Sequence, residues 1–368
     1  MPWYNDLRPE KDHDRKEYSL VFPGLSDNDR RAILPNLLHL RAALAERIPV
    51  KKNDHNLLLA SWNIKEFGHL DKRLPESYMY IAEIISKFDL IAIQEIKSTL
   101  KDLLIVMKLL DNNFGYVITD VTEGNDGNSE RFGYIYDKRK VIPSGLSGEI
   151  TLWDEITQDS PIRQLKRSPA ITGFKAGWKS FIIINIHLHP GNNADDKSLR
   201  KEEVRLLIKA IEEKIKRGHL WNENIILLGD TNLYRNNEDI IQLFHDSKFK
   251  ESEGLEGKVT NVSNNEIYDR IFLRTNDFFQ LIHKNGKENG DVFNVYDHVF
   301  TEASRRDYHD VMIHQKDDAS NLTSDTAFRT YYHRYWKRNQ VSDHNPVWIE
   351  ILIDSSDLFL SQNLSAMG

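Results

Sequence analysis

Polar side chains that could do chemistry recur at the ends of short apolar runs in this chain. They lie in SWN, IAIQE, INIH, LLGDTN, YDR and SDH, and the residues are Asn63, Gln94, Glu95, His187, Asp230, Asn232, Asp269, Asp343 and His344. One polar residue at such a place is usually a solvated strand end, but so many together indicate a shared cleft. Burying several carboxylates side by side is costly unless a cation compensates their charge.

The candidate ligands in this set are hard oxygen atoms. Oxygen donors such as Asn63, Glu95 and Asp343 suit Mg²⁺ best, with Mn²⁺ or Ca²⁺ as alternatives, and suit zinc less well. The two histidines are then better suited to proton transfer, because a neighbouring carboxylate orients an imidazole and favours its protonated form. A metal, carboxylates and histidines together are suited to the attack of water on phosphorus.

Composition excludes several other classes of protein. The chain has 368 residues, 40% of them hydrophobic, a net charge of −7 and no cysteine. Disulfides, thiolate metal sites and cysteine nucleophiles are therefore excluded, and a uniformly basic nucleic-acid coat is not expected, although a local basic groove is compatible with this charge. The N-terminus lacks an apolar signal stretch, and no run reaches the roughly 18 apolar residues of a membrane span. We expect a cytoplasmic protein with no membrane contact.

Short apolar runs from residue 57 onward predict buried strands. They cover residues 57–64, 89–96, 132–137, 181–188, 224–230, 267–273, 295–300 and 346–353. Helical patterns at 75–88 and 196–218 lie between some of them. Strands mixed with helices in this way are typical of an α/β or α+β sandwich.

Residues 1–56 have the character of an N-terminal helical extension. The stretch 26–48 has helical periodicity, with Leu37, Leu40, Leu44 and Ile48 near one face. We expect Ser26 or Asp27 to cap this helix and Pro35 to break or restart it. Packing on the main body is the expected use of the helix, and binding of a protein partner is the alternative. Residues 301–340 are interpreted as an insertion, and residues 355–368 as a C-terminal tail.

Taken in order, the motifs resemble a known superfamily. The series WNIKEFG, IQEIK, SERF, RSPA, INIHL, GDTN, YDRI and SDHNPV, from residue 62 to residue 347, is similar to the endonuclease/exonuclease/phosphatase superfamily, and most similar to its deoxyribonuclease I branch. The resemblance covers about residues 57–354. It implies an α+β fold, a four-layer αββα sandwich, with the active site at the strand ends.

The resemblance also implies a role for each matching residue. The implied metal ligands are Glu95 as the principal one, Asn63 beside it, and Asp343, with Asp230 and Asn232 organising metal, water and phosphate. The implied acid–base pairs are His187 with Glu130 and His344 with Asp269. The implied substrate contacts are Arg167 on a phosphate and Lys65 and Lys97 facing DNA.

The chain departs from the branch at two DNA-contacting positions. Asn128 stands where the branch has an aromatic residue for minor-groove stacking, inside the glycine-rich loop 122–130, which we expect to be mobile. Lys97 stands where the branch often has arginine, and it keeps the charge but lacks the bidentate fork. The branch is also disulfide-bonded and this chain cannot be. These changes weaken the case for the same duplex binding and leave the chemistry intact.

The function expected from these residues is a Mg²⁺-dependent DNA endonuclease that leaves 5′-phosphate and 3′-hydroxyl ends. A phosphatase or phosphodiesterase acting on inositol phosphates or phospholipids is the alternative, because GDTNLYR loosely echoes the inositol-polyphosphate enzymes. Against it, the tryptophan and cysteine that those enzymes carry before DRI are absent. Exonuclease III-type enzymes usually have tyrosine where His187 stands. A catalytically inactive binding module is disfavoured because every expected polar position is filled.

Two further features have both a functional and a structural interpretation. His189 forms an HxH pair with His187, which could indicate a second metal. We favour the interpretation that His189 only lies next to the site. The segment 328–340 (FRTYYHRYWKRNQ) combines aromatic and basic residues as a nucleic-acid platform does. We hypothesise that it replaces the lost groove contact, with a packed loop as an equal alternative.

Overall fold

Two six-stranded sheets form the centre of the molecule in the computed structural model, which describes residues 2–12, 20–70, 72–121, 129–220 and 222–367. The first sheet runs in the order β13 (Gly290–Val292), β14 (Val347–Leu352), β1 (Asn56–Phe67), β2 (Leu90–Lys97), β4 (Glu130–Asp137) and β3 (Phe114–Ile118). The second runs in the order β5 (Ile142–Glu149), β6 (Ala170–Ala176), β7 (Lys179–His187), β8 (Ile225–Asp230), β10 (Asp269–Arg274) and β9 (Lys250–Glu251). A small hairpin of β11 (His283–Lys284) and β12 (Lys287–Glu288) stands apart.

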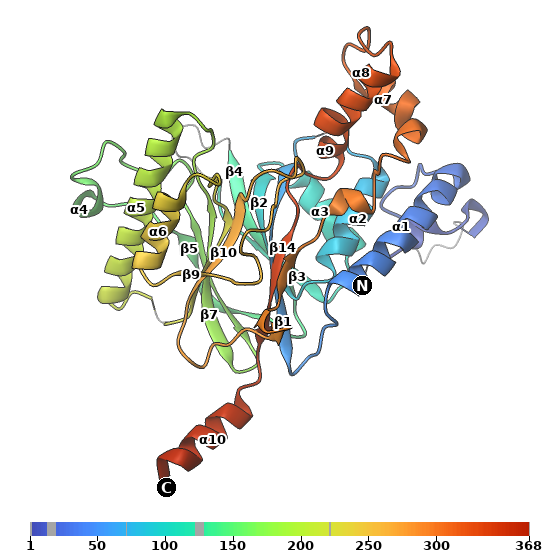
Figure 1. Ribbon diagram of the computed structural model, residues 1–368. Helices are drawn as coiled ribbons and strands as arrows, with labels where there is room; N and C mark the ends of the chain where they lie inside the picture. Colours follow the sequence, from blue (N-terminus) through green and yellow to red (C-terminus); the bar gives the residue numbers. More distant parts are fainter. Residues whose placement is uncertain (1, 13–19, 71, 122–128, 221, 368) are drawn as a thin grey trace.

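Helices cover the outer faces of both sheets, so the fold has the four layers expected (Figure 1). On the first sheet lie α1 (Asp27–Arg47), α2 (Pro75–Ile85) and α3 (Lys101–Leu109). On the second lie α5 (Ala194–Lys216), α6 (Glu238–Asp246) and the short α4 (Asp154–Thr157). A separate core between the sheets contains Leu59, Ala92, Phe174, Ile183 and Leu228. The α+β sandwich predicted from the sequence is confirmed.

Strand directions bring the chemistry to one edge of the sandwich. β1 and β2 run parallel in the first sheet, and β7 and β8 run parallel in the second, so the carboxyl ends of each pair lie together. The antiparallel strands β4, β10 and β14 begin at the same edge. The register places His187 opposite Asp230, and Asp230 opposite Asp269. Side chains that are 43 and 39 residues apart in the sequence therefore become neighbours, with Asp230 between His187 and Asp269.

The N-terminal helix packs on the main body, as its apolar face predicted. Leu37, Leu40, Leu44 and Ile48 are all buried in the core that α1 shares with α2. Ser26 caps the helix in a reciprocal capping box with Asp29. The expectation of a break at Pro35 was wrong, because α1 is continuous from Asp27 to Arg47. Pro35 lies on the exposed face, where water can satisfy the carbonyl that its missing N–H leaves unpaired.

Residues 295–300 are not the strand that their apolar pattern predicted. Val295–Asp297 form a 3₁₀ turn, and Val295, Val299 and Phe300 are buried against the helical layer rather than paired in a sheet. The apolar residues of a short run can be buried by a turn as well as by a strand, so a pattern over six residues could not decide.

The segment 301–340 is helical and stands at one end of the molecule (Figure 1, upper right). It contains a 3₁₀ turn at Arg305–Tyr308, α7 (His309–Gln315), α8 (Asp325–Tyr331), a π-helical turn at Tyr332–Trp336 and α9 (Lys337–Gln340). Tyr332 and Trp336 are almost fully buried in the core of the first helical layer. The insertion is therefore anchored to the body by aromatic side chains.

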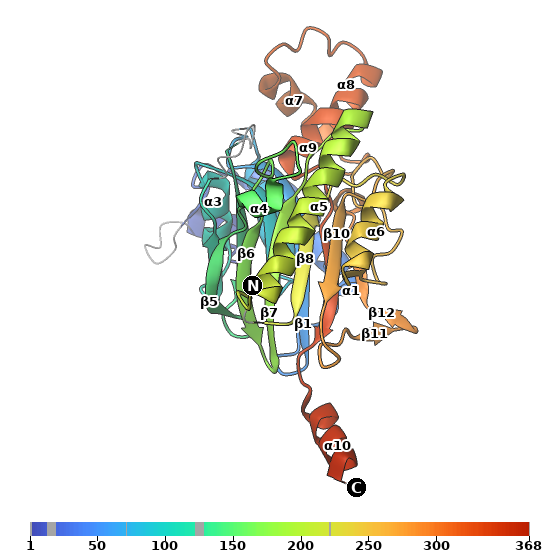
Figure 2. The ribbon, with the colours of Figure 1, turned by 90° about the vertical axis from the view of Figure 1, so that its left-hand side faces the viewer.

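The C-terminal tail forms α10 (Ser356–Met367), which projects away from the body (Figure 2). None of its residues is buried. Across the described parts of the chain, no helix combines the length and the apolar character that crossing a membrane requires.

Candidate active site

Asp230 lies at the centre of the polar residues gathered at this edge. Its Oδ2 atom is 3.4 Å from His187 Nε2 and 3.6 Å from His344 Nε2, and it accepts a 2.9 Å hydrogen bond from Asn63 Nδ2. Only 2% of the residue is exposed. Burial raises the pKa of this carboxyl, but the charges of His344 and His187 outweigh that effect and lower it. The structure thus holds an anion between two imidazoles.

Each imidazole has a second carboxylate on its other nitrogen. His187 Nδ1 lies 3.1 Å from Glu130 Oε2, and His344 Nδ1 lies 2.8 Å from Asp269 Oδ2. These are the two pairs that the resemblance implied. A carboxylate on Nδ1 fixes the ring orientation and leaves Nε2 facing the site.

Charge shifts the proton affinity of both pairs. Burial opposes ionisation of Glu130, but the hydrogen bond and charge of His187 and the guanidinium of Arg167 hold the pKa of that carboxyl well below its usual range. Burial also opposes protonation of His344, but Asp269 and Asp230 together raise the pKa of the ring well above its usual value. These shifts favour an ionised Glu130 and a protonated His344, while burial raises the pKa of Asp269.

Asn63 and Glu95 lie side by side where the sequence predicted a metal. Asn63 Nδ2 donates to Glu95 Oε1 over 2.9 Å, and Glu66 N donates to Glu95 Oε2 over 2.8 Å. Within the described chain, Asn63 Oδ1 is a buried oxygen with no hydrogen-bond partner. An orphaned buried oxygen beside a carboxylate is the donor chemistry that a hard divalent cation satisfies. The residues present therefore fit the implied metal.

The backbone around Glu95 is unusual in a way that serves this arrangement. Glu95 has φ 62° and Asn232 has φ 47°, both in the left-handed region that such residues seldom adopt. The β1–β2 and β2–β4 ladders also slip in register near Glu95. Bulges and strained residues of this kind turn a side chain out of the pleat, and they cluster at functional sites.

Other groups surround the same position. One ligand atom each of Glu95, Glu130 and His187 lie within 4.8 Å of one another, so the proposed metal site borders the first dyad. Asp343 stands further out, one-third exposed, with Oδ2 3.9 Å from Lys65 Nζ. Asn232 is turned toward the backbone, and its Nδ2 donates to Leu188 O over 3.0 Å. The five predicted ligands share one edge, and the side chains of Asn63 and Asp230 each contact two of the others.

Arg167 faces Glu130 and retains a spare donor. Its Nε donates to Glu130 Oε2 over 2.7 Å, while its terminal NH1 is buried with no partner among the described residues. A guanidinium nitrogen held in this way can bind a phosphate oxygen. Lys97 also points at Glu130, with Nζ 3.5 Å from Oε1, and its side chain is mostly buried.

Sequence reasoning missed the side chains that hold this site in place. Ser342 Oγ donates to Asn63 O over 2.7 Å and accepts from Lys65 N and His344 N, each over 3.1 Å. It therefore ties β1 to the His344 loop. The serine of SDHNPV was the available signal, since a hydroxyl before a turn often bonds the backbone.

Trp62 is a second missed support. Its Nε1 donates to His344 O over 2.9 Å, and its ring is completely buried. Gln94, by contrast, was grouped with the site but points between the sheets, where its Nε2 donates to Ser61 Oγ and Asn185 Oδ1. Successive residues of a strand face opposite ways, so Gln94 and Glu95 do not both face the cleft.

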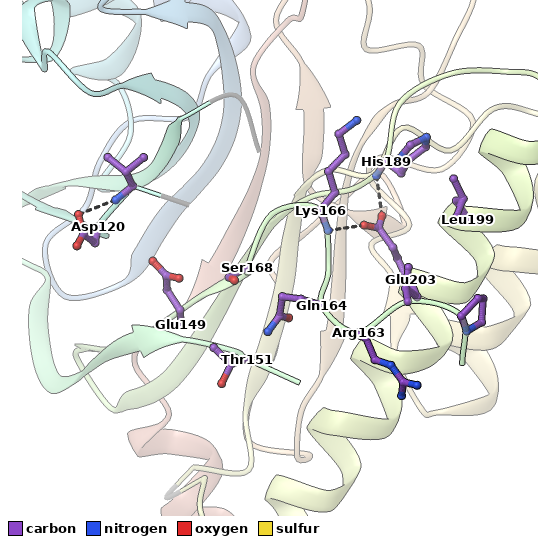
Figure 3. A pocket seen from close by; sticks show the side chains of 13 residues that line it. Asp120, Glu149, Thr151, Arg163, Gln164, Lys166, Ser168, His189, Leu199 and Glu203 are labelled. Carbon is purple, nitrogen blue, oxygen red and sulfur yellow. Dashed lines mark hydrogen bonds between the residues drawn. The ribbon is translucent and has the colours of Figure 1, made fainter. Parts of the chain in front are cut away.

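A cleft of about 840 Å³ opens between helix α5 and the loop that precedes β6 (Figure 3). Lys166, Ser168 and His189 line it, and they are sequence neighbours of Arg167 and His187. His189 Nε2 lies 3.1 Å from Asp196 Oδ1, and the backbone nitrogens of His189 and Lys166 both donate to Glu203. His189 is thus fixed by helix α5 beside the site, as the structural interpretation expected.

The aromatic and basic segment 328–340 has only some of its aromatic side chains available for stacking. Tyr332 and Trp336 are buried in the core and cannot stack on bases, so that part of the hypothesis was wrong. Tyr335 remains exposed. The physical reason is that helical periodicity turns alternate aromatic residues inward. Asn128 lies outside the described residues, as does the rest of the loop from residue 122 to residue 128.

Comparisons with known proteins agree with this geometry. No protein-family model matches the chain. Deoxyribonuclease-1 of Homo sapiens is 25% identical over 211 residues, which are 54% of this chain and 66% of that protein. Deoxyribonuclease-1 of Bos taurus is 25% identical over 233 residues, which are 59% of this chain and 77% of that protein. The chain thus spans slightly less than two thirds of the human relative's length.

Solved structures share the fold. An endonuclease/exonuclease/phosphatase family protein from Bacteroides thetaiotaomicron has a TM-score of 0.51 and 18% identity, and the match covers 81% of this chain and 95% of that one. A mannosyl-6-phosphatase of the same organism has a TM-score of 0.50 and 18% identity, with coverage of 80% and 99%. Fold and relatives together confirm the resemblance to the endonuclease/exonuclease/phosphatase superfamily in its deoxyribonuclease I-like form.

Proposed function

We propose that this protein is a divalent-metal-dependent phosphodiesterase, and specifically a DNA endonuclease that leaves 5′-phosphate and 3′-hydroxyl ends. The observation that carries the proposal is the pair of dyads, Glu130–His187 and Asp269–His344, that face the single carboxylate Asp230. Two oriented imidazoles on one shared carboxylate suit a reaction that needs one proton removed and another delivered.

Mg²⁺ is the proposed cofactor, with Mn²⁺ or Ca²⁺ as alternatives. Asn63 and Glu95 would hold it, with Asp343, Asp230 and Asn232 nearby. A bound divalent cation neutralises negative charge on the phosphoryl oxygens.

The chain's own residues then perform the displacement. A water oxygen bonds to phosphorus while the bond from phosphorus to O3′ breaks. One imidazole removes a proton from the water, and the other delivers a proton to the leaving O3′. Asp230 stabilises the positive charge that either ring acquires, and Arg167 orients a phosphate oxygen through its spare NH1.

DNA is the proposed substrate because the sequence relatives are deoxyribonucleases by name. Lys65, Lys97 and Arg167 supply positive charge at the same edge. A cytoplasmic location and a protein partner for residues 1–56 remain predictions from the sequence.

The test is the nicking of supercoiled plasmid by the purified protein with Mg²⁺, Mn²⁺ or EDTA. His344→Ala is the active-site variant, and His219→Ala, an exposed histidine beyond the end of α5, is the matched control. We expect metal-dependent nicking that the control retains and His344→Ala loses. Single-stranded DNA and RNA are offered in parallel.

Two results would overturn the proposal. Nicking that persists in EDTA or in His344→Ala would assign the activity to another site or to a contaminant. Failure to cut any nucleic acid, with release of phosphate from inositol phosphates or cleavage of phospholipids instead, would establish the alternative function of the same site.

A further inference from the structure

A small polar pocket lies beside the His344 dyad, between the insertion and the body. Its volume is about 210 Å³, and its lining includes Asn261, Asn264, Asn294, Tyr296, Lys337 and Asn345. Four amide side chains, one ammonium group and the carboxylate of Asp297 line it. The catalytic residues assigned above do not line it.

Lys337 is a buried cation in this pocket. Only 8% of the residue is exposed, and its ammonium lies 4.5 Å from the centre of the Tyr296 ring. Among the described residues, this ammonium has neither an ion pair nor a hydrogen bond. Burial, followed by the charge of Arg338, lowers the pKa of Lys337 to about 8. A buried charge without a carboxylate partner is unusual unless a ligand supplies the counter-charge.

The pocket is joined directly to the catalytic loop. Asn345 follows His344 in the chain, and Asn261 forms an antiparallel bridge with His344. Val262 N donates to Asp343 O over 2.9 Å. A ligand in the pocket would therefore lie next to the second dyad rather than on a separate face.

A second cation, Arg338, follows Lys337 in the chain. Arg338 NH2 donates to Ser263 Oγ over 2.9 Å, which joins the insertion to the loop that carries Asn261 and Asn264. The π-helical turn at Tyr332–Trp336 immediately precedes Lys337 and changes the helical phase there. Asp297 also lines the pocket, but it is exposed, so water and salt screen its charge.

We propose that this pocket binds a backbone phosphate of the substrate strand, separate from the scissile phosphate and on the His344 side of it. Lysine binds phosphate as a point charge, and the pocket offers one buried ammonium with amides around it, which fits a single phosphate group. The inference rests on the proposed function and adds to it: the insertion extends the site along the strand, and substrates longer than one linkage are favoured.

The experiment compares two DNA probes with Lys337→Gln in buffer containing EDTA. One probe is a dinucleotide with a single phosphodiester, and the other is a fluorescent single-stranded oligonucleotide of a dozen nucleotides. Arg306→Gln, an exposed cation of the same insertion outside the pocket, is the matched control. Binding is measured by anisotropy for the oligonucleotide and by competition for the dinucleotide, over a range of salt concentrations.

We expect Lys337→Gln to weaken oligonucleotide binding about tenfold, the effect of one charged hydrogen bond, and to leave the dinucleotide unchanged. The salt dependence of oligonucleotide binding should also lose about 0.7 in log–log slope, the share of one phosphate on a single strand. Equal affinities of wild type and Lys337→Gln for the oligonucleotide would overturn the inference, and so would an equal loss for both probes.

A second measurement does not depend on the variant folding. Lys337 of the wild-type protein is acetylated with a lysine-selective reagent with and without the oligonucleotide, and the modified peptide is quantified. Protection of Lys337 supports the phosphate site, and undiminished acetylation at saturating DNA contradicts it. If wild-type protein cuts DNA while Lys337 is neither protected nor needed, this inference alone fails. If it neither binds nor cuts DNA, the proposed function fails first.

Discussion

Nε2 of His187 lies 3.4 Å from Oδ2 of Asp230, and this contact turns two separate dyads into one unit. The same carboxylate oxygen lies 3.6 Å from Nε2 of His344. Asp230 is therefore the only described carboxylate in contact with both imidazoles, one from β7 and one from the loop before β14. Protonation of either ring changes the field at the other through this shared anion.

Asp230→Asn should remove that coupling with almost no change in shape. We expect kcat to fall about 10³-fold, as for loss of a group that supports proton transfer, with KM nearly unchanged. Steady-state cleavage of a fluorogenic DNA substrate measures both constants. Circular dichroism and the thermal midpoint serve as folding controls, and a variant with near wild-type kcat would remove Asp230 from the mechanism.

The two histidines should act together rather than additively. His187→Ala and His344→Ala are each expected to lower kcat about 10²–10⁴-fold, the range of general acid–base catalysis. The double variant should be no more than about tenfold slower than the slower single one, because either loss already disables the unit. Rates for all three variants decide this, and strictly multiplicative losses would indicate independent roles.

Sequence patterns predicted the elements that carry strong periodicity. The runs at 57–64, 89–96 and 181–188 became β1, β2 and β7, because long β-branched and leucine runs are buried on both faces of a sandwich. Strands with a weaker apolar pattern were not predicted. β5 reads IPSGLSGE and has only exposed or half-buried residues, so no apolar alternation marks it. The helices α7 to α9 were also not predicted, because each is only four to seven residues long.

The order of the motifs predicted the candidate site residues, but it did not predict which of their side chains contact one another. Sequence order cannot show that Asp230 would touch both His187 and His344, because that depends on the parallel pairing of β7 with β8 and on the loop before β14. Gln94 was grouped with Glu95 because both are polar, and the bulge that separates them leaves no signal in a single sequence. The buried position of Lys337 likewise depends on the π-helical turn before it.

Glu95→Gln should abolish the stabilisation by Mg²⁺ without changing the stability of the metal-free protein. If Glu95 holds the cation, Mg²⁺ at a hundredfold excess over its Kd stabilises the wild type by about 2.7 kcal/mol, a rise of several degrees in thermal midpoint. The variant should show no such rise and the same midpoint as the wild type in EDTA. Calorimetric titration with Mg²⁺ gives an independent readout, and an unchanged heat of binding in Glu95→Gln would place the metal elsewhere.

Arg73→Met should test the support beneath the site. The fully buried guanidinium pairs with Asp102 and donates to Lys65 O over 2.8 Å and Val341 O over 3.1 Å, so it joins β1 to the end of the insertion. Removing it leaves a buried carboxylate unpaired, which should lower the free energy of unfolding by about 3–5 kcal/mol. Urea unfolding measures the loss.

The neighbouring residue Lys72 provides the matched control. Its side chain is 52% exposed and pairs with the exposed Asp317, so Lys72→Met should change stability by less than about 1 kcal/mol. Similar effects of the two variants would show that the buried network adds nothing beyond surface charge.

Lys337→Met should make the protein more stable at neutral pH, and the reason lies in the proton balance. Burial holds the pKa of Lys337 at about 8, below its value of 10.5 in the unfolded chain, so folding must retain a disfavoured charge at pH 7. After allowance for solvent screening, methionine should add about 1–2 kcal/mol to the free energy of unfolding.

The pH dependence separates this effect from simple repacking. Between about pH 8 and 10.5 the unfolded wild type binds more protons than the folded one, so wild-type stability rises relative to the variant and the difference closes. Below pH 8 both states of the wild type are protonated and the difference is constant. Urea unfolding at several pH values from 6.5 to 10 follows this, and a pH-independent difference would show that the ammonium is not destabilised by burial. A lysine that lowers stability at neutral pH, yet is required for binding long strands, would be retained for function rather than for folding.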